Sequence, residues 1–262
     1  MTTKGLKILV PLPRYGCEPT EVSVPWSYLK AAGHTVVFAT PDGTPARADE
    51  RILTGKDLGL LASTLGCDQD TQNLYHQMEA SEEFQKPVPW TDIRSEDYDA
   101  IFLPGGHDKP VREYLESAIV QKVIGEMFDQ EKPVAAVCRG VLLTSRSVHP
   151  KTGKSVLYGK KTTTFTRWQE MACHNLTRLW LGDYFLTYPE TYVEDAVKEH
   201  LAKPEDFEEG PGFVIPHHDT DAKPDGFALL DGKYLSSRGP WDIHRFSAEF
   251  VNLLASASAN KA

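Results

Sequence analysis

The chain has 262 residues and a formal net charge of −9, with 40% hydrophobic and 10% aromatic residues. This length accommodates one large α/β domain or two small ones, and the composition is typical of a folded protein. The acidic balance, without clustered Lys and Arg, argues against a nucleic-acid partner. No apolar run approaches the roughly 18 residues needed to cross a membrane, and the apolar stretch at the N-terminus is too short for a signal peptide, so we expect a cytosolic protein that does not contact membranes.

The first half of the chain alternates between strand and helix patterns. Short β-rich runs are expected at 7–13, 35–43 and 99–106, and apolar residues recur at helical spacing over 21–34 and 117–132. A further strand, 133–137, leads into a cysteine. Strands that alternate with helices predict an α/β fold with a mainly parallel sheet sandwiched by helices, whose reactive groups gather at the carboxyl ends of the strands.

Three other segments carry separate expectations. The polar stretch 44–95 interrupts the alternation and is interpreted in part as an insertion that walls a pocket or contacts a partner. Residues 227–240 predict a hairpin with Asp-Gly at its turn, followed by a closing helix over 241–255. We expect a disordered tail over 255–262. Because no repeat or linker is visible, 1–254 is predicted to be a single domain.

The sequence gives little sign of metal or cofactor binding. The four cysteines lie far apart without a CxxC spacing, which favours free thiols over disulfides or a zinc site. The His-His-Asp run at 217–219 suggests a metal site, but three consecutive residues rarely point at one ion, and we expect no metal. No phosphate loop or cofactor fingerprint is present, so no cofactor is expected.

Cys138 stands where the strand 133–137 meets a helix-compatible segment. The run Ala-Val-Cys-Arg-Gly, 136–140, has the form small-x-nucleophile-x-Gly that a nucleophile elbow requires. A helix N-terminus and the charge of Arg139 are both expected to lower the pKa of the thiol. The alternative is a buried, inert cysteine, which is the commoner state of a single cysteine.

Two further groups are candidates for the same site. The backbone N–H groups of Gly105 and Gly106, which end a neighbouring strand, and that of Arg139 would together form an oxyanion hole. Glu21, after the first strand, is a candidate proton carrier for Cys138. The alternatives are glycines that only make a turn and a glutamate that only stabilises the start of a helix.

Five ordered motifs give the chain a family resemblance. Glu-Val-Ser-Val-Pro at 21–25, the stretch 31–43, Phe-Leu-Pro-Gly-Gly-His at 102–107, Ala-Ala-Val-Cys-Arg-Gly at 135–140 and Leu-Ser-Ser-Arg-Gly-Pro at 235–240 resemble the ThiJ/PfpI superfamily, especially its larger members in the glyoxalase III and deglycase-like branch. The resemblance implies the flavodoxin-like, class I glutamine amidotransferase-like fold and a homodimer. It also implies that Cys138 is the nucleophile, that Glu21 lies beside its sulfur, and that Gly106 and Arg139 supply oxyanion N–H groups.

The chain departs from many of these relatives at one position. Where they have Cys-His-Gly, this sequence has Arg139, and a guanidinium does not accept a proton. Base catalysis must then come from Glu21 or from a histidine elsewhere, while Arg139 would stabilise thiolate or pair with an acidic substrate. Further pocket candidates, each with a plain structural alternative, are His107, His174, Trp168, Arg238 and Trp241.

These observations favour a cysteine-dependent enzyme without a cofactor. The Cys138 thiolate would add to a small electrophilic substrate, such as an α-oxoaldehyde, amide or nitrile, with help from Glu21. The alternative is a non-catalytic redox sensor or stress chaperone in which Cys138 is oxidised. A glutaminase subunit is disfavoured, because no histidine is followed two residues later by glutamate.

Overall fold

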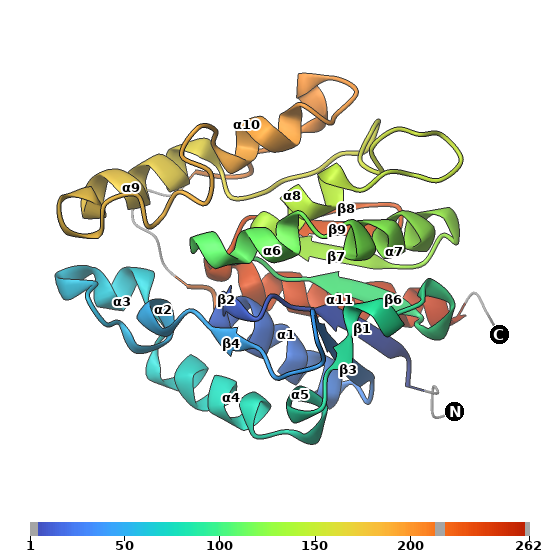
Figure 1. Cartoon of the computed structure of the whole chain (residues 1–262), viewed down its shortest axis with the longest axis horizontal. Coiled ribbons are helices and arrows are strands. Elements are labelled where there is room, and N and C mark those ends of the chain that lie inside the picture. The colour runs from blue at the N-terminus through green and yellow to red at the C-terminus, as the bar shows by residue number, and fades with distance from the viewer. Residues whose placement is uncertain (1–4, 213–217, 260–262) are drawn as a thin grey trace.

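A computed structural model describes residues 5–212 and 218–259 of the chain. Its centre is a seven-stranded sheet with the strand order β5-β3-β1-β6-β7-β9-β8 (Figure 1). All neighbouring strands in it are parallel except β8 and β9. The strands are β1 (Lys7–Pro11), β3 (Thr35–Thr40), β5 (Val88–Pro89), β6 (Ala100–Leu103), β7 (Val134–Val137), β8 (Ala228–Asp231) and β9 (Tyr234–Ser237), with β2 (Tyr15–Cys17) and β4 (Arg47–Ala48) forming a separate pair.

Helices cover both faces of this sheet. One layer contains α1 (Pro19–Ala31), α4 (Gln69–Glu79), α5 (Glu82–Gln85) and α11 (Ile243–Ala259). The other contains α6 (Arg112–Leu115), α7 (Ala118–Asp129), α8 (Arg139–Arg146) and α10 (Val193–Lys198). The remaining helices are α2 (Glu50–Thr54), α3 (Ala62–Leu65), α9 (Arg167–Leu181) and the short 3-10 turns Gly59–Leu61, Trp90–Asp92, Ser95–Asp97, Lys109–Val111, Pro204–Asp206 and Pro240–Asp242.

The central strands are buried on both faces. On β6, Ala100 and Phe102 belong to the core under α1 and α11, whereas Ile101 and Leu103 belong to the core under α7 and α8. This alternation follows from the two-residue period of a strand, and it explains why these strands read as continuous apolar runs. The predicted α/β fold with a mainly parallel, helix-covered sheet is confirmed.

The C-terminal part differs from the prediction in one respect. The hairpin 227–240 is present as β8 and β9, joined through Gly232 at φ 63°. The closing helix, however, continues to Ala259, so 255–259 are helical rather than disordered. The residues that anchor this helix, Leu253 and Leu254, are buried in the core, and helix propagation beyond such an anchor costs little. Residues 260–262 lie outside the described part.

The stretch 44–95 is structured throughout and belongs to the main body. Its strand β5 pairs with β3 at the edge of the sheet, and its helix α4 packs along α1. Only Leu60 of this stretch is a large, exposed apolar side chain among the described residues. Large exposed apolar side chains gather instead on α9, which carries Trp168, Met171, Leu176, Leu179 and Trp180. No helix in the described ranges has the length and apolar character needed to cross a membrane.

The turn from β7 to α8 requires close approach of two backbones. A Cβ on Gly140 would stand 2.0 Å from the carbonyl oxygen of Leu103 on the neighbouring strand. Only glycine allows the first turn of α8 to lie so near β6. The small residue expected at this position is therefore a steric requirement of the turn.

We predict that Gly140→Ala lowers the free energy of unfolding by at least about 1–3 kcal/mol, because the new methyl group meets backbone that cannot move aside. Urea denaturation measures the change. Gly212→Ala is the matched control, since a Cβ there meets nothing within 4 Å, and its effect is expected to stay within about 0.5 kcal/mol. Equal stability of the two variants would contradict the close approach.

Candidate active site

Cys138 occupies a strained turn at the carboxyl end of β7. Its backbone has φ 54° and ψ −128°, a region that costs a residue other than glycine about 1–3 kcal/mol. Two hydrogen bonds hold it there: the Cys138 N–H donates to the Ser237 carbonyl at 3.1 Å, and the Thr164 hydroxyl donates to the Cys138 carbonyl at 2.7 Å. The elbow predicted from the sequence thus exists as a geometry, and it directs the thiol away from the sheet.

Glu21 lies beside this thiol, in the first turn of α1. The carboxylate of Glu18 caps that helix and accepts the Glu21 N–H at 2.5 Å, while the Gly105 N–H donates to Glu21 Oε2 at 2.8 Å. Glu21 lies near enough to Cys138 for each group to shift the pKa of the other. Its other oxygen, Oε1, is buried and has no hydrogen-bond partner among the described residues. Glu21 is therefore held on one side and has one oxygen free for a reacting group.

The expected oxyanion donors fall into two groups. Since the Gly105 N–H is already bonded to Glu21, it is not available to a substrate oxygen, and this expectation is wrong for the resting state. Gly106 lines the space in front of Cys138, and the backbone N–H of Arg139 lies close enough to the thiol to hydrogen-bond it. Gly106 and Arg139 remain the predicted oxyanion pair.

Burial controls the ionisation of this pair. It raises the pKa of Glu21 to about 7, opposed by the hydrogen bond from Gly105. Burial, followed by the nearby charge of Glu21, also raises the pKa of the Cys138 thiol, while Arg139 opposes this shift. The sequence predicted a lowered thiol pKa, and the net direction is the reverse because the thiol is only 4% exposed. Near neutral pH the resting group is therefore a thiol beside a carboxyl group that is poised to exchange its proton.

Arg139 is buried and fully engaged by the protein. Its Nη1 lies 3.5 Å from the Cys138 sulfur, and its Nη2 donates to Glu170 Oε1 at 2.6 Å. Its Nε donates to the Thr187 hydroxyl at 2.9 Å, and Nη2 also donates to the Phe185 carbonyl at 3.0 Å. Because Glu170 balances the guanidinium charge internally, the geometry favours the thiol-facing role of Arg139 over binding of an acidic substrate.

A small cavity of about 40 Å³ adjoins these groups. Two of the five sequence-predicted pocket residues, His107 and Trp241, line it. Ile52 and Leu65 form part of its wall, so the stretch 44–95 does contribute to a pocket. The full lining is Glu18, Glu21, Ile52, Leu65, Gly106, His107, Cys138, Arg139, Phe165, Cys173, Phe185, Pro240 and Trp241.

The other three pocket candidates do not line this cavity. Trp168 is 40% exposed on the outer face of α9, and His174 lies one turn and a half further along the same helix. Arg238 forms a two-pronged ion pair with Asp242, with contacts of 2.7 and 2.8 Å. Arg238 also donates to the Pro211 carbonyl at 2.6 Å, and it thereby holds the chain in place at Pro211.

Several residues of the site were not predicted from the sequence. Glu170, Phe185 and Thr187 contact Arg139 from 31 to 48 residues further along the chain. No local motif marks them, because their role comes from α9 and the segment after it folding over the elbow. Cys173, from the same helix, brings a second thiol to the cavity wall.

The four cysteines are free, as predicted, and all four are buried. In 5–212 and 218–259, no three His, Cys, Asp or Glu side chains are placed to hold a metal ion. His217 of the His-His-Asp run lies outside these residues, and the Asp219 carboxylate accepts the backbone N–H groups of His244 and Arg245.

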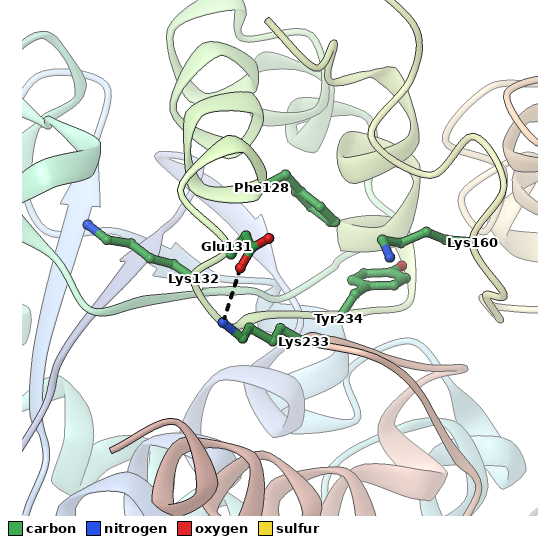
Figure 2. A pocket seen from close by; sticks show the side chains of 6 residues that line it. All are labelled: Phe128, Glu131, Lys132, Lys160, Lys233 and Tyr234. Atoms are coloured by element: carbon green, nitrogen blue, oxygen red, sulfur yellow. Dashed lines mark ion pairs between the residues drawn. The ribbon is translucent and has the colours of Figure 1, made fainter. Parts of the chain in front are cut away.

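A larger hollow of about 250 Å³ lies at the opposite edge of the sheet (Figure 2). This hollow lies at the amino ends of β7 and β9, and reactive groups are seldom found at that end of a parallel sheet. Its lysines already have partners: Lys233 pairs with Glu131 at 3.8 Å, Lys160 pairs with Asp231 at 3.8 Å, and Lys132 donates to the Ser95 carbonyl. The smaller cavity at Cys138 is therefore the better candidate for chemistry.

We predict that Glu170→Gln destabilises the protein by about 3 kcal/mol or more, because it leaves the Arg139 charge buried without its counter-charge. Chemical denaturation measures the loss. The matched control is Glu82→Gln, which removes the exposed pair with Lys86 and should cost no more than about 0.5 kcal/mol. Similar losses in both variants would contradict the importance of the buried pair.

We also predict that Glu21→Gln shifts alkylation of Cys138 to lower pH than in the wild type. The substitution removes the like charge that helps to raise the pKa of the thiol. Peptide mass analysis of iodoacetamide labelling against pH measures the shift, with Cys67 as internal reference because burial also raises its pKa. An unchanged midpoint would mean that Glu21 is already protonated when the thiol ionises.

Comparison with known proteins places the chain in a family. The family model described as ThiJ/PfpI family-like matches residues 12–211. Glyoxalase 3 of Candida albicans is 34% identical over 76 residues, which is 29% of this chain and 32% of that protein. A deglycase of Thermococcus kodakarensis is 23% identical over 252 residues, covering 95% of this chain and 99% of the relative. The crystal structure of the Candida albicans glyoxalase III superposes with a TM-score of 0.70 at 19% identity, covering 95% of this chain and 97% of that one.

The sequence matches to the first curated relatives are partial. They span 45%, 32% and 60% of proteins from Schizosaccharomyces pombe, Candida albicans and Saccharomyces cerevisiae, respectively. The structural likeness at 19% identity establishes the fold alone. The family model, by contrast, covers most of the chain, including the elbow at Cys138. The chain therefore belongs to the ThiJ/PfpI family.

Proposed function

We propose that this protein is a cofactor-independent enzyme that converts a small α-oxoaldehyde into the corresponding hydroxy acid through a covalent adduct on Cys138. The observation that carries the proposal is the buried pairing of the Cys138 thiol with a carboxyl group, Glu21, whose pKa is raised to about 7. Relatives named as glyoxalases and a deglycase support this reaction class.

The proposed reaction begins with transfer of the thiol proton to Glu21. The sulfur attacks the aldehyde carbon, a C–S bond forms, and the carbonyl oxygen takes the proton back from Glu21 to give a hemithioacetal. The N–H groups of Gly106 and Arg139 would stabilise the negative charge on that oxygen while it exists. Glu21 then takes the proton of the aldehyde carbon and delivers it to the neighbouring carbon, while the hydroxyl proton passes to the neighbouring oxygen. This leaves a 2-hydroxy thioester on Cys138, and water releases the hydroxy acid.

The cavity favours small substrates of moderate polarity. Its walls include the stacked rings of Phe165 and Trp241, with centroids 5.8 Å apart, and the ring of Phe185. With a volume of about 40 Å³ it has little room for a bulky compound. A compact dicarbonyl compound suits such a space better than a bulky amide or a peptide.

We predict that the purified protein forms hydroxy acid from short α-oxoaldehydes and that Cys138→Ser abolishes this activity. Glu21→Gln should slow turnover by about 10²–10⁴-fold even though it makes the thiol easier to alkylate, because the proton carrier is lost. The wild-type rate should rise with pH through about 7, where Glu21 becomes the base form.

Product formation is followed by chromatography over a panel of α-oxoaldehydes, simple aldehydes, amides and nitriles. Cys67→Ser is the control, since Cys67 does not line the cavity and its partner Thr20 can bond a hydroxyl equally well. If no compound gives turnover that depends on Cys138, the proposed function is wrong.

A further inference from the structure

We propose that His107, oriented by Asp49, is the base that activates water when the acyl group leaves Cys138. This inference rests on the proposed function and deepens it by assigning the final step. It answers a chemical need of this chain: hydrolysis of a thioester requires a group that accepts a proton from water, and the residue next to the nucleophile, Arg139, does not accept one.

Among the polar residues that line the cavity, His107 is the one suited to this task. Glu21 already carries out the earlier proton transfers beside the sulfur. The Glu18 carboxyl is already engaged in capping α1 through the Glu21 N–H, and burial, followed by the charge of Glu21, raises its pKa well above the usual range. An imidazole in the neutral form accepts a proton readily.

Ring contacts fix the position of His107. It follows the Gly105-Gly106 pair, lines the cavity and is only 7% exposed. Its ring stacks on Phe185 at a centroid distance of 4.6 Å and an angle of 15°, and it meets the edge of Tyr184 at 4.6 Å. A side chain enclosed on two sides in this way cannot rotate freely, so it faces the site in one orientation.

Asp49 supplies the orienting carboxylate. Its Oδ2 lies 3.8 Å from His107 Nε2, and the Tyr184 hydroxyl donates to the same oxygen at 2.6 Å. His107 Nε2 is buried and has no hydrogen-bond partner among the described residues, and its ion-pair contact there is with Asp49. A carboxylate on that side favours the N–H at Nε2 and stabilises the imidazolium that forms when the ring takes up a proton.

Arg139 connects the contacts of His107 with the turn at Cys138. The Thr187 hydroxyl accepts from Arg139 Nε and donates to the His107 carbonyl at 2.7 Å, while Arg139 also holds the Phe185 carbonyl. Arg139 thus fixes Phe185, the residue on whose ring the imidazole stacks. Burial, followed by the charges of Arg139 and Arg51, lowers the pKa of His107, which keeps the ring neutral before the step.

In the proposed step, His107 takes one proton from water while the water oxygen bonds to the thioester carbon. The C–S bond then breaks, and its electron pair returns to the Cys138 sulfur. The imidazolium gives its proton to the leaving thiolate. One acyl thioester and one water become one hydroxy acid and one thiol.

The test compares His107→Gln with the matched control His174→Gln in the full-length protein. His174 is the other histidine considered for the pocket, but it does not line the cavity. With an α-oxoaldehyde as substrate, His107→Gln should lower kcat by 100-fold or more, lower KM in parallel, and accumulate an acyl adduct on Cys138. Hydroxylamine should release that adduct as a hydroxamate. His174→Gln should behave as the wild type does.

The outcomes separate the two proposals. A stalled, hydroxylamine-sensitive adduct in His107→Gln supports the assignment, and a weaker accumulation in Asp49→Asn supports the orienting role of the carboxylate. Normal turnover in His107→Gln, or slow turnover without an adduct, overturns the assignment while leaving the proposed function intact. A wild-type protein without any Cys138-dependent turnover overturns both.

Discussion

The backbone turn at Cys138 is the constraint on which the rest of the site depends. A residue with a side chain is held at positive φ there, and the strain is tolerated because the sheet determines the backbone on both sides of it. The bond to Ser237 comes from β9, and the close contact at Gly140 comes from β6. Each strand next to β7 therefore makes one of the contacts that fix this turn. The thiol lies where the carboxyl ends of these strands meet.

Around this turn the protein assembles an uncommon density of buried ionisable groups. Glu18, Glu21, Arg139 and Glu170 are each 5% exposed or less. One strong ion pair, Arg139 with Glu170, lies within this set, and burial raises the pKa of the other two carboxyl groups. The arginine that takes the place of the familiar histidine is thus no isolated substitution. It is compensated by Glu170 and by the segment that contains Phe185 and Thr187.

Local signals in the sequence were sufficient for the sheet, the main helices and the elbow, because strand periodicity and the small-x-Cys-x-Gly spacing depend on neighbouring residues. The ionisation of Cys138 was predicted with the wrong sign, because it depends on burial by segments far away in the chain. The contacts of Arg139 were missed for the same reason. Trp168, His174 and Arg238 were pocket candidates because of their residue types. Whether such side chains reach the cavity depends on the path of α9 and of the loop before the closing helix, which no local pattern shows.

The small size of the cavity also governs access to Cys138. At about 40 Å³ the space in front of the thiol is narrow, and Ile52, Leu65 and Trp241 form part of its wall. The indole N–H of Trp241 donates to the Thr64 carbonyl, which links this wall to the short helix α3. A buried thiol behind such a narrow space is shielded from large oxidants and electrophiles more strongly than from small ones.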